Sequence, residues 1–401
     1  MSGYSLLNGI RILEVAQLAP SSLGGHLADL GAEVIKVETG AGDPVRVGGS
    51  RSVGEPDGPS FMHLRWNRGK KSVDIDLRLD EGKQTFLALA AQCDAVIEGM
   101  RGGYLDWLGI GYPELRQANP SIVLCTVSGM GTDGPYRTLG TGGPVFDAYA
   151  GLREVSTPDT PPADGVAGSR TPPIAMYALG AYAAMGLLAA LHKARSTGEG
   201  SHVEVAGIDV AAAWMPDLAD AKLNEARSIP RPTWLPDGRL PDWPRLEAYR
   251  TKDGEAILFG SHVEKFWHNF LCAVGRDDLI DVDLTSTDAD APRRANMVWQ
   301  ALTEIFAQRT RSEWVEMFVE HGIAGGPVNT IDDMLADPHF VARDNTYTVA
   351  YPGVGDLEFI TSPVRVAGET FAPDLPPAVG AHTADILAGL TPAQPTPQES
   401  Q

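Results

Sequence analysis

Short apolar strands alternate with amphipathic helical segments along the first 130 residues, and this alternation constrains the fold more than any other feature. A strand is predicted at 11–17, a helix at 21–32 and a second strand at 33–38. The same pattern continues with strands at 72–77, 95–100 and 121–129 and a helix over 82–93. Strand–helix–strand units of this kind predict an α/β fold whose parallel sheet is covered by helices, with a Rossmann-like order as the expected architecture.

Several classes of site lack their usual sequence signals. No Gly-x-Gly-x-x-Gly is expected to open any of the predicted strand–helix turns, so a nicotinamide or flavin cofactor is not indicated. The chain has neither His-Glu-x-x-His nor paired cysteines at zinc spacing, and no Gly-x-Ser-x-Gly. We therefore expect no metal site and no hydrolase serine.

Charge and cysteine usage indicate the compartment and the partners. The formal net charge is −20, which disfavours nucleic acid and anionic membranes as partners. Cys93, Cys125 and Cys272 are far apart in sequence, as in proteins of a reducing compartment. The N-terminus lacks the pattern of a signal peptide. We expect a cytoplasmic protein.

The longest apolar run covers 174–191 and just reaches the length of a membrane span. It consists largely of Ala and Gly, and no basic cluster marks a cytoplasmic side. A buried helix that packs closely through Gly180, Ala184 and Gly186 is the better prediction.

Basic residues gather where a parallel sheet receives ligands. The segment 65–71, RWNRGKK, holds four cations and no acid in an otherwise acidic chain. It could bind phosphate groups or be a solvated loop before a strand. Lys36, Arg46 and Arg101 lie at or after strand ends and suggest an anion-binding rim. Asp147 has apolar neighbours and could be catalytic or simply hydrogen-bonded.

Read in order, a series of segments resembles the family III CoA-transferases, which include formyl-CoA and carnitine CoA-transferases and the α-methylacyl-CoA racemases. The resemblance rests on LLNGIRILEVAQ, LADLGAEVIKVETGAGDPVR, NRGKKSVDIDL, LGIGYPELRQANPSIVLCTVSGMGTDGPY, LLAALHKARSTGEGSHVEVAGIDV, GGPVNTIDDMLADPHFVAR and PPAVGAHTADIL. These segments span nearly the whole chain in the order of the family.

The resemblance implies a domain organisation and an assembly. We expect a large Rossmann-like CoA-binding domain over 1–225 and a smaller α+β domain over 226–330, with a Pro- and Trp-rich loop at 229–245 near their boundary. Residues 331–401 are expected to return to the large domain and to end in a frayed tail. Members of the family form dimers in which two ring-like chains interlock.

The resemblance also implies a ligand and its contacts. CoA or acyl-CoA is expected as a substrate, with no covalently bound cofactor. The positions that match the CoA-contacting segments of the family are Lys36, Asn67, Arg68, Lys70 and Lys71, with Arg101 and Arg137 as weaker matches.

The chemistry that the resemblance implies is missing a central group. Family transferases use an aspartate that attacks the acyl-CoA thioester, passes through an anhydride and then carries CoA as an aspartyl thioester. That aspartate falls on Met176, and the neighbouring residues Ala175 and Tyr177 are not carboxylates either. The His-Asp pair of the racemases falls on Gly142 and Gly143. The resemblance therefore predicts a degenerate active site.

Three functions remain open on this basis. The first is a subunit that lacks its own catalytic Asp and works with a homologous catalytic partner in a heterodimer or heterotetramer, as in the two-subunit benzylsuccinate CoA-transferases. The second is an active homodimeric transferase or racemase with a relocated group, for which Asp147 is the fallback. The third is a non-catalytic acyl-CoA-binding protein.

Overall fold

The structure, a computed structural model, describes residues 3–152, 173–215, 219–227, 244–284 and 288–390. Two compact units divide the chain: a large unit of 1–223 with 345–401, and a small unit of 224–344. The domain boundaries at 225 and 330 remain predictions, whereas the compact units divide after residues 223 and 344. The expected frayed tail and most of the Pro- and Trp-rich loop lie outside the described residues.

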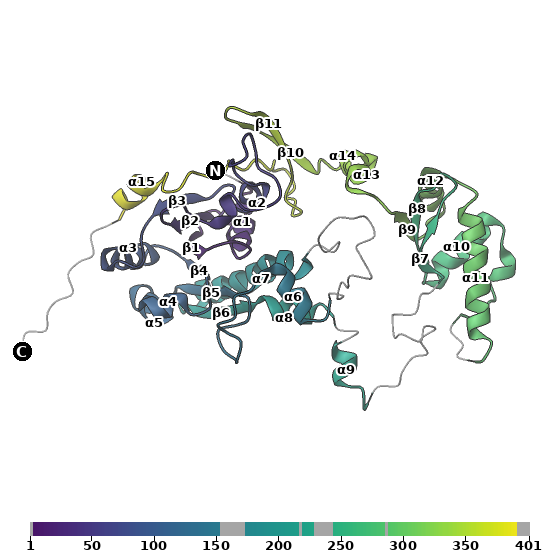
Figure 1. The fold of residues 1–401 in the computed structure, drawn as a ribbon, viewed down its shortest axis with the longest axis horizontal. Helices are drawn as coiled ribbons and strands as arrows, with labels where there is room; N and C mark the ends of the chain where they lie inside the picture. The colour runs from purple at the N-terminus through teal and green to yellow at the C-terminus, as the bar shows by residue number, and fades with distance from the viewer. Residues whose placement is uncertain (1–2, 153–172, 216–218, 228–243, 285–287, 391–401) are drawn as a thin grey trace, which may run out of the picture. The chain divides into compact units, whose positions relative to one another are not determined.

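A six-stranded parallel sheet forms the centre of the large unit (Figure 1). Its strands are β1 (Arg11–Ala16), β2 (Glu33–Glu38), β3 (Lys71–Asp74), β4 (Ala95–Gly99), β5 (Val123–Ser128) and β6 (Ser201–Ala206). Their order is β3-β2-β1-β4-β5-β6, which is the Rossmann-like order. The predicted α/β fold with a parallel sheet is therefore confirmed, and the segment SHVEVA adds the edge strand β6.

Helices cover both faces of this sheet, and each face has its own apolar core. One core includes Leu27, Leu179 and Leu187, and the other includes Phe86, Leu89 and Leu115. The helices of the large unit are α1 (Ser21–Asp29), α2 (Phe61–Trp66), α3 (Asp80–Ala90), α4 (Tyr104–Leu108), α5 (Tyr112–Ala118), α6 (Gly143–Tyr149), α7 (Ile174–Thr197), α8 (Gly207–Ala213), α9 (Ala221–Leu223) and α15 (Thr383–Ala388). A short 3-10 turn, η1 (Pro44–Arg46), follows β2.

The apolar run forms α7, which packs against α1, β5 and β6. Among the described residues α7 is the one helix whose length and hydropathy would suit a membrane span, yet half of its apolar window is buried inside the protein. A Cβ atom on Gly180 would lie 2.3 Å from Ser22 Oγ, so α7 and α1 are in close contact at this glycine. The predicted close packing at Gly180 is confirmed, and α7 serves as a core helix of the large unit.

The small unit combines a three-stranded antiparallel sheet with helices around an aromatic core. Its strands are β7 (Leu246–Arg250), β8 (Ala256–Gly260) and β9 (Gly325–Pro327), and its helices are α10 (Glu264–Val274), η3 (Asp277–Leu279), α11 (Ala291–Phe306), α12 (Arg311–His321), α13 (Ile331–Ala336) and α14 (Pro338–Ala342). Phe259, Phe270 and Phe306 pack ring against ring in its core.

The chain returns to the large unit at residue 345 and forms the hairpin β10 (Thr346–Tyr351) and β11 (Gly355–Ile360), which lies near α2 in Figure 1. We call residues 345–390 the C-terminal return.

Candidate active site

Met176 lies in the first turn of α7 and is half-buried against apolar neighbours. Its side chain packs on the cluster formed by Ala19, Val45 and Trp66. It also fills the space above Gly143: a Cβ atom on that glycine would lie 2.4 Å from Met176 Sδ. The position expected to carry a nucleophile is therefore an apolar packing position in this chain.

Asp147 occupies a neighbouring position on α6. Its carboxylate is buried, and Oδ1 accepts a hydrogen bond of 3.1 Å from the backbone N–H of Ala175, in the first turn of α7. A helix N-terminus has backbone N–H groups without helical partners, and a carboxylate satisfies one of them. Asp147 thus caps α7 from another helix, immediately before Met176.

Lys36 lies on β2, opposite Glu14 of β1, and is buried rather than exposed to a ligand. Its ammonium group donates to Glu14 Oε1 at 2.8 Å and to the carbonyl of Ala16, and it lies 3.1 Å from Asp43 Oδ2. Burial alone would lower the pKa of Lys36, but Glu14 and Asp43 raise it above its ordinary value.

Lys70 is equally buried and shares Glu14 with Lys36. Its ammonium group donates to both oxygens of Glu14, at 2.9 and 2.7 Å, to the carbonyl of Ser21 and to Asn67 Oδ1. Burial lowers the pKa of Lys70 to about 8, although Glu14 opposes the shift. An ammonium group has three hydrogens, so the donors of both lysines are engaged inside the protein.

Two arginines of the segment 65–71 hold the C-terminal return. Arg68 forms a buried ion pair with Asp29, and its guanidinium lies 4.9 Å from the ring centroid of Phe371. Arg65 donates to the carbonyl of Ile360. Two of the four cations in this segment, which was considered for phosphate binding, therefore contact other parts of the protein.

The remaining predicted CoA contacts lie at opposite edges of the sheet. Lys71 begins β3 and pairs with Glu33 at the first residue of β2. Arg101 and Arg137 are exposed on the loops that follow β4 and β5, and neither side chain bonds to another described residue. These two loops touch, because a Cβ atom on Gly102 would lie 3.1 Å from the carbonyl oxygen of Gly131. The structure therefore brings Arg101 and Arg137 to the carboxyl edge and leaves Lys71 at the other.

Glu14, Asp43 and His63 are polar residues of this region that sequence reasoning did not single out. All three are buried, and Glu14 lies in a strand whose other residues after Arg11 are apolar. A carboxylate in such a strand was the one available signal, because a buried charge requires a partner.

The spacing Gly-x-Gly-x-x-Gly also occurs at 129–134, but it follows β5 and leads into irregular turns instead of opening a helix.

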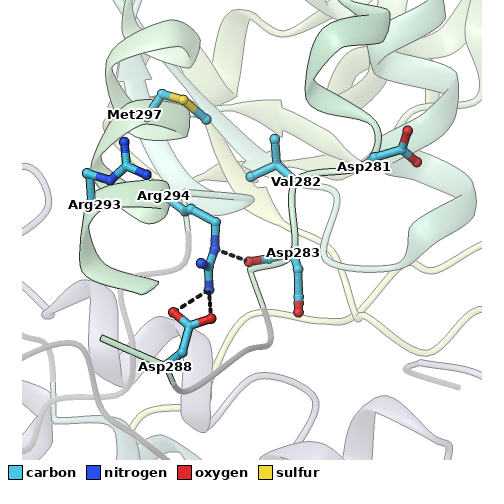
Figure 2. Close-up of a pocket in the computed structure, with 7 residues that line it drawn as sticks. All are labelled: Asp281, Val282, Asp283, Asp288, Arg293, Arg294 and Met297. Carbon is cyan, nitrogen blue, oxygen red and sulfur yellow. Dashed lines mark hydrogen bonds and ion pairs between the residues drawn. The ribbon is translucent and has the colours of Figure 1, made fainter. Parts of the chain in front are cut away.

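The small unit contains a cavity of about 400 Å³ lined by Asp281, Val282, Asp283, Asp288, Arg293, Arg294 and Met297 (Figure 2). Arg294 spans it, donating to the carbonyl of Asp283 at 2.8 Å and pairing with Asp288. No predicted site residue lines this cavity.

The family model for CoA-transferase family III matches residues 7–383. The chain belongs to CoA-transferase family III. It is 31% identical over 394 residues to succinyl-CoA–D-citramalate CoA-transferase of Chloroflexus aurantiacus, covering 96% of this chain and 94% of that one. It is 29% identical to the succinyl-CoA–L-malate CoA-transferase alpha subunit of the same organism, covering 96% of this chain and 88% of that subunit.

A solved structure is similar to this family III chain over nearly its whole length. It is a crystal structure of Rv3272 from Mycobacterium tuberculosis in which one aspartate is replaced by alanine, with a TM-score of 0.78 and 29% identity. The match covers 96% of this chain and 98% of that chain. The names of these relatives describe transfer of CoA between carboxylic acids. The positions of Met176, Gly143 and Asp147 are therefore compared with what this transfer requires.

Proposed function

We propose that this family III chain is a CoA-binding subunit that lacks its own catalytic aspartate and takes part in CoA transfer with a homologous catalytic partner. The observation that carries the proposal is Met176, which occupies the expected nucleophile position as an apolar packing residue. A thioether cannot form the acyl anhydride through which a carboxylate exchanges acyl group and CoA.

The neighbouring carboxylate does not replace the missing one in this proposal. Asp147 Oδ1 is held by the N–H of Ala175, so attack on a thioester would compete with the cap of α7. We therefore assign Asp147 a structural role and expect the reacting carboxylate from the partner.

The proposed CoA site lies at the carboxyl edge of the parallel sheet, where ligands of open α/β sheets bind. Arg101 and Arg137 are exposed there and suit phosphate groups. The buried Lys36, Asn67 and Lys70 would support this edge from inside the large unit, whereas Arg68 is held by Asp29 at the last residue of α1. We do not include Lys71, because it lies at the opposite edge.

A homologous partner would cover apolar side chains that are exposed on the large unit of this chain. Tyr177 and Met185 on α7 and Trp214 after α8 are each at least half exposed. Burial of such side chains stabilises protein–protein contacts. The malate enzyme of Chloroflexus provides a named precedent for a two-subunit relative, since its similar chain is an alpha subunit. We propose an interlocked dimer with such a partner.

We also propose a cytoplasmic location. Cys93 and Cys125 are buried free thiols, and Cys272 is free as well. Unpaired thiols are typical of proteins in a reducing compartment.

The direct test measures CoA exchange between succinyl-CoA and a panel of carboxylic acids. The purified chain is expected to give no exchange, and the chain co-expressed with an aspartate-bearing homologue is expected to give it. Robust exchange by the purified chain would contradict the proposal and support the homodimeric enzyme. Binding of CoA without exchange in every combination would support the acyl-CoA-binding protein instead.

A companion variant, Met176→Asp, places a carboxylate at the nucleophile position. We expect incubation with an acyl-CoA to yield a hydroxylamine-sensitive adduct on the peptide that contains residue 176, detected by mass spectrometry. Met185→Asp is the matched control, because Met185 is exposed on the same helix and away from its first turn. Adducts on both variants, or on neither, would argue against this location of the site.

A further inference from the structure

Buried polar side chains below the sheet's carboxyl edge form a chain of contacts that begins at Lys70. Lys70 and Lys36 both donate to Glu14, at 2.7 and 2.8 Å. Lys36 lies 3.1 Å from Asp43, whose backbone N–H donates to Glu38 at 3.0 Å. Four of these five side chains belong to β1, β2 and the turn before η1, so the contacts cross between elements.

The chain of contacts then closes on itself. Glu38 accepts two hydrogen bonds from Arg46, which lies 3.3 Å from Nε2 of His63. His63 Nδ1 lies 3.1 Å from the amide of Asn67, and Asn67 accepts from Lys70 at 2.9 Å. We call this closed set the polar ring.

The polar ring balances its charge. It contains three cations, Lys36, Arg46 and Lys70, and three carboxylates, Glu14, Glu38 and Asp43. Buried charges are tolerated when they are paired and hydrogen-bonded, and removal of one partner leaves its neighbour uncompensated. Each member therefore depends on the others, and we expect the polar ring to hold its side chains in fixed positions.

The polar ring contacts the loop between β1 and α1, residues 17–20. Asp43 Oδ1 accepts the backbone N–H of Leu18 at 2.9 Å, and Asp43 Oδ2 accepts the hydroxyl of Ser21 at 2.8 Å. Leu18 has a φ of 56°, a left-handed conformation that is costly for a branched residue. The carboxylate of Asp43 thus supports a conformation that the sequence of the loop disfavours.

The loop lies where the strand order reverses, between β1 and β4. A Cβ atom on Gly99, the last residue of β4, would lie 2.5 Å from Pro20 Cβ, so the loop directly adjoins the end of β4. On its other side, Ala19 belongs to the cluster against which Met176 packs. The loop therefore lies between the proposed CoA edge and the position of the lost nucleophile.

We propose that Asp43 is a positioning residue that fixes the 17–20 loop, through Leu18 and Ser21, in the conformation that binds CoA. This inference rests on the CoA site proposed above. Asp43 itself is buried and touches no ligand in this proposal.

The test compares Asp43→Asn with Asp94→Asn in the full-length chain. Asp94 is the control, since its carboxylate also accepts a backbone N–H, that of Arg11 at 2.8 Å, but at the opposite end of β1. CoA binding is measured by calorimetry well below the melting temperature of each variant. We expect Asp43→Asn to weaken CoA binding by about tenfold or more, and Asp94→Asn to change it by less than about twofold.

Rescue separates positioning from a general loss of stability. Glycine adopts the left-handed conformation without a steric cost, so Leu18→Gly should restore part of the CoA affinity in the Asp43→Asn background. If Asp43→Asn does not fold, Ser21→Ala removes one Asp43 contact and is expected to weaken CoA binding in the same direction.

Several results would overturn the inference. Equal CoA affinities of Asp43→Asn and wild type, equal losses in the Asp43 and Asp94 variants, or no recovery with Leu18→Gly would each contradict positioning. If the wild-type chain, alone and in complex with its partner, bound no CoA, the proposed CoA site itself would fail. That result differs from the three results above, because in each of those the wild-type chain binds CoA.

Discussion

At the scale of single residues, Gly143 and Met176 share one space. The atoms of Met176 lie where a side chain on Gly143 would begin, at 2.4 Å from its Cβ position. The two positions at which the family's catalytic groups are expected are thus joined by packing, since a side chain on residue 143 would collide with Met176.

This coupling predicts the cost of refilling position 143. We expect Gly143→Ala to lower the free energy of unfolding by roughly 1–3 kcal/mol through overpacking, and to cost clearly less when Met176 is also changed to Ala. Urea unfolding of the four proteins in this double-mutant cycle measures the difference. Gly142→Ala is the control, because open space surrounds that position. Additive effects of the two changes would refute the coupling.

His63 predicts how the stability of the large unit depends on pH. Burial, followed by the nearby Arg46, lowers the pKa of His63 from 6.5 to about 3. Between these values the unfolded chain binds a proton that the folded chain does not, so stability is lost as pH falls below about 6.5. The loss should reach about 2 kcal/mol at pH 5, since one pKa unit corresponds to about 1.4 kcal/mol.

The measurement is the free energy of unfolding between pH 8 and pH 5 for the wild type and for His63→Gln. The amide oxygen of glutamine can still accept from Arg46, but the side chain does not titrate. A flatter profile is therefore expected in the variant. Identical slopes would mean that His63 does not carry the proton.

Sequence reasoning found the basic residues near the site but not what they bind. Lys36 and Lys70 each contact Glu14, which lies 22 and 56 residues away. Residue type and local spacing carry no information on such long-range pairs, and a lysine at a strand end is equally compatible with a ligand or an internal carboxylate. Arg101 and Arg137 lie on loops that meet at the carboxyl edge, a position that strand ends alone determine, and their contact with CoA stays a prediction.

At the scale of elements, α7 begins at a cap supplied by α6. Asp147→Ala should lower the free energy of unfolding by about 0.5–2 kcal/mol, because the N–H of Ala175 loses its acceptor. Asp147→Asn keeps an oxygen and should cost less. Thermal or urea unfolding gives both values.

The same two variants separate capping from catalysis. If Asp147 were a nucleophile, Asp147→Asn would abolish CoA exchange in the complex while leaving stability nearly unchanged. If Asp147 is only a cap, Asp147→Ala should lower the free energy of unfolding more than Asp147→Asn, and Asp147→Asn should leave CoA exchange by the complex intact.

Element boundaries followed from hydrophobic periodicity and turn residues. The strands predicted at 33–38 and 95–100 are β2 and β4, displaced by at most one residue, because each has a short run of β-branched apolar residues that follows a helix and a turn. Gly254 and Gly353 lie in the turns of the antiparallel pairs β7–β8 and β10–β11, and their positive φ angles suit tight turns. Strand β9, three residues with two glycines, has no such signal and was not predicted.

At the scale of the whole molecule, the chain leaves the large unit, forms the small unit and comes back. Residues more than 270 positions apart are joined by this return, as in the hydrogen bond between Arg68 and Tyr347. The resemblance to the family supplied this organisation, since no local pattern at 345–360 indicates which unit the hairpin contacts. The family also supplied the expected nucleophile, and the proposal that methionine occupies its position rests on the residues of this chain.

The central claim is that the reacting carboxylate comes from a partner, and covalent trapping tests it most directly. The complex with an aspartate-bearing homologue is incubated with an acyl-CoA and quenched with hydroxylamine, and mass spectrometry locates the modified aspartate. We predict the modification on the partner chain and none on this one. A modified aspartate in this chain, at Asp147 or elsewhere, would contradict the account.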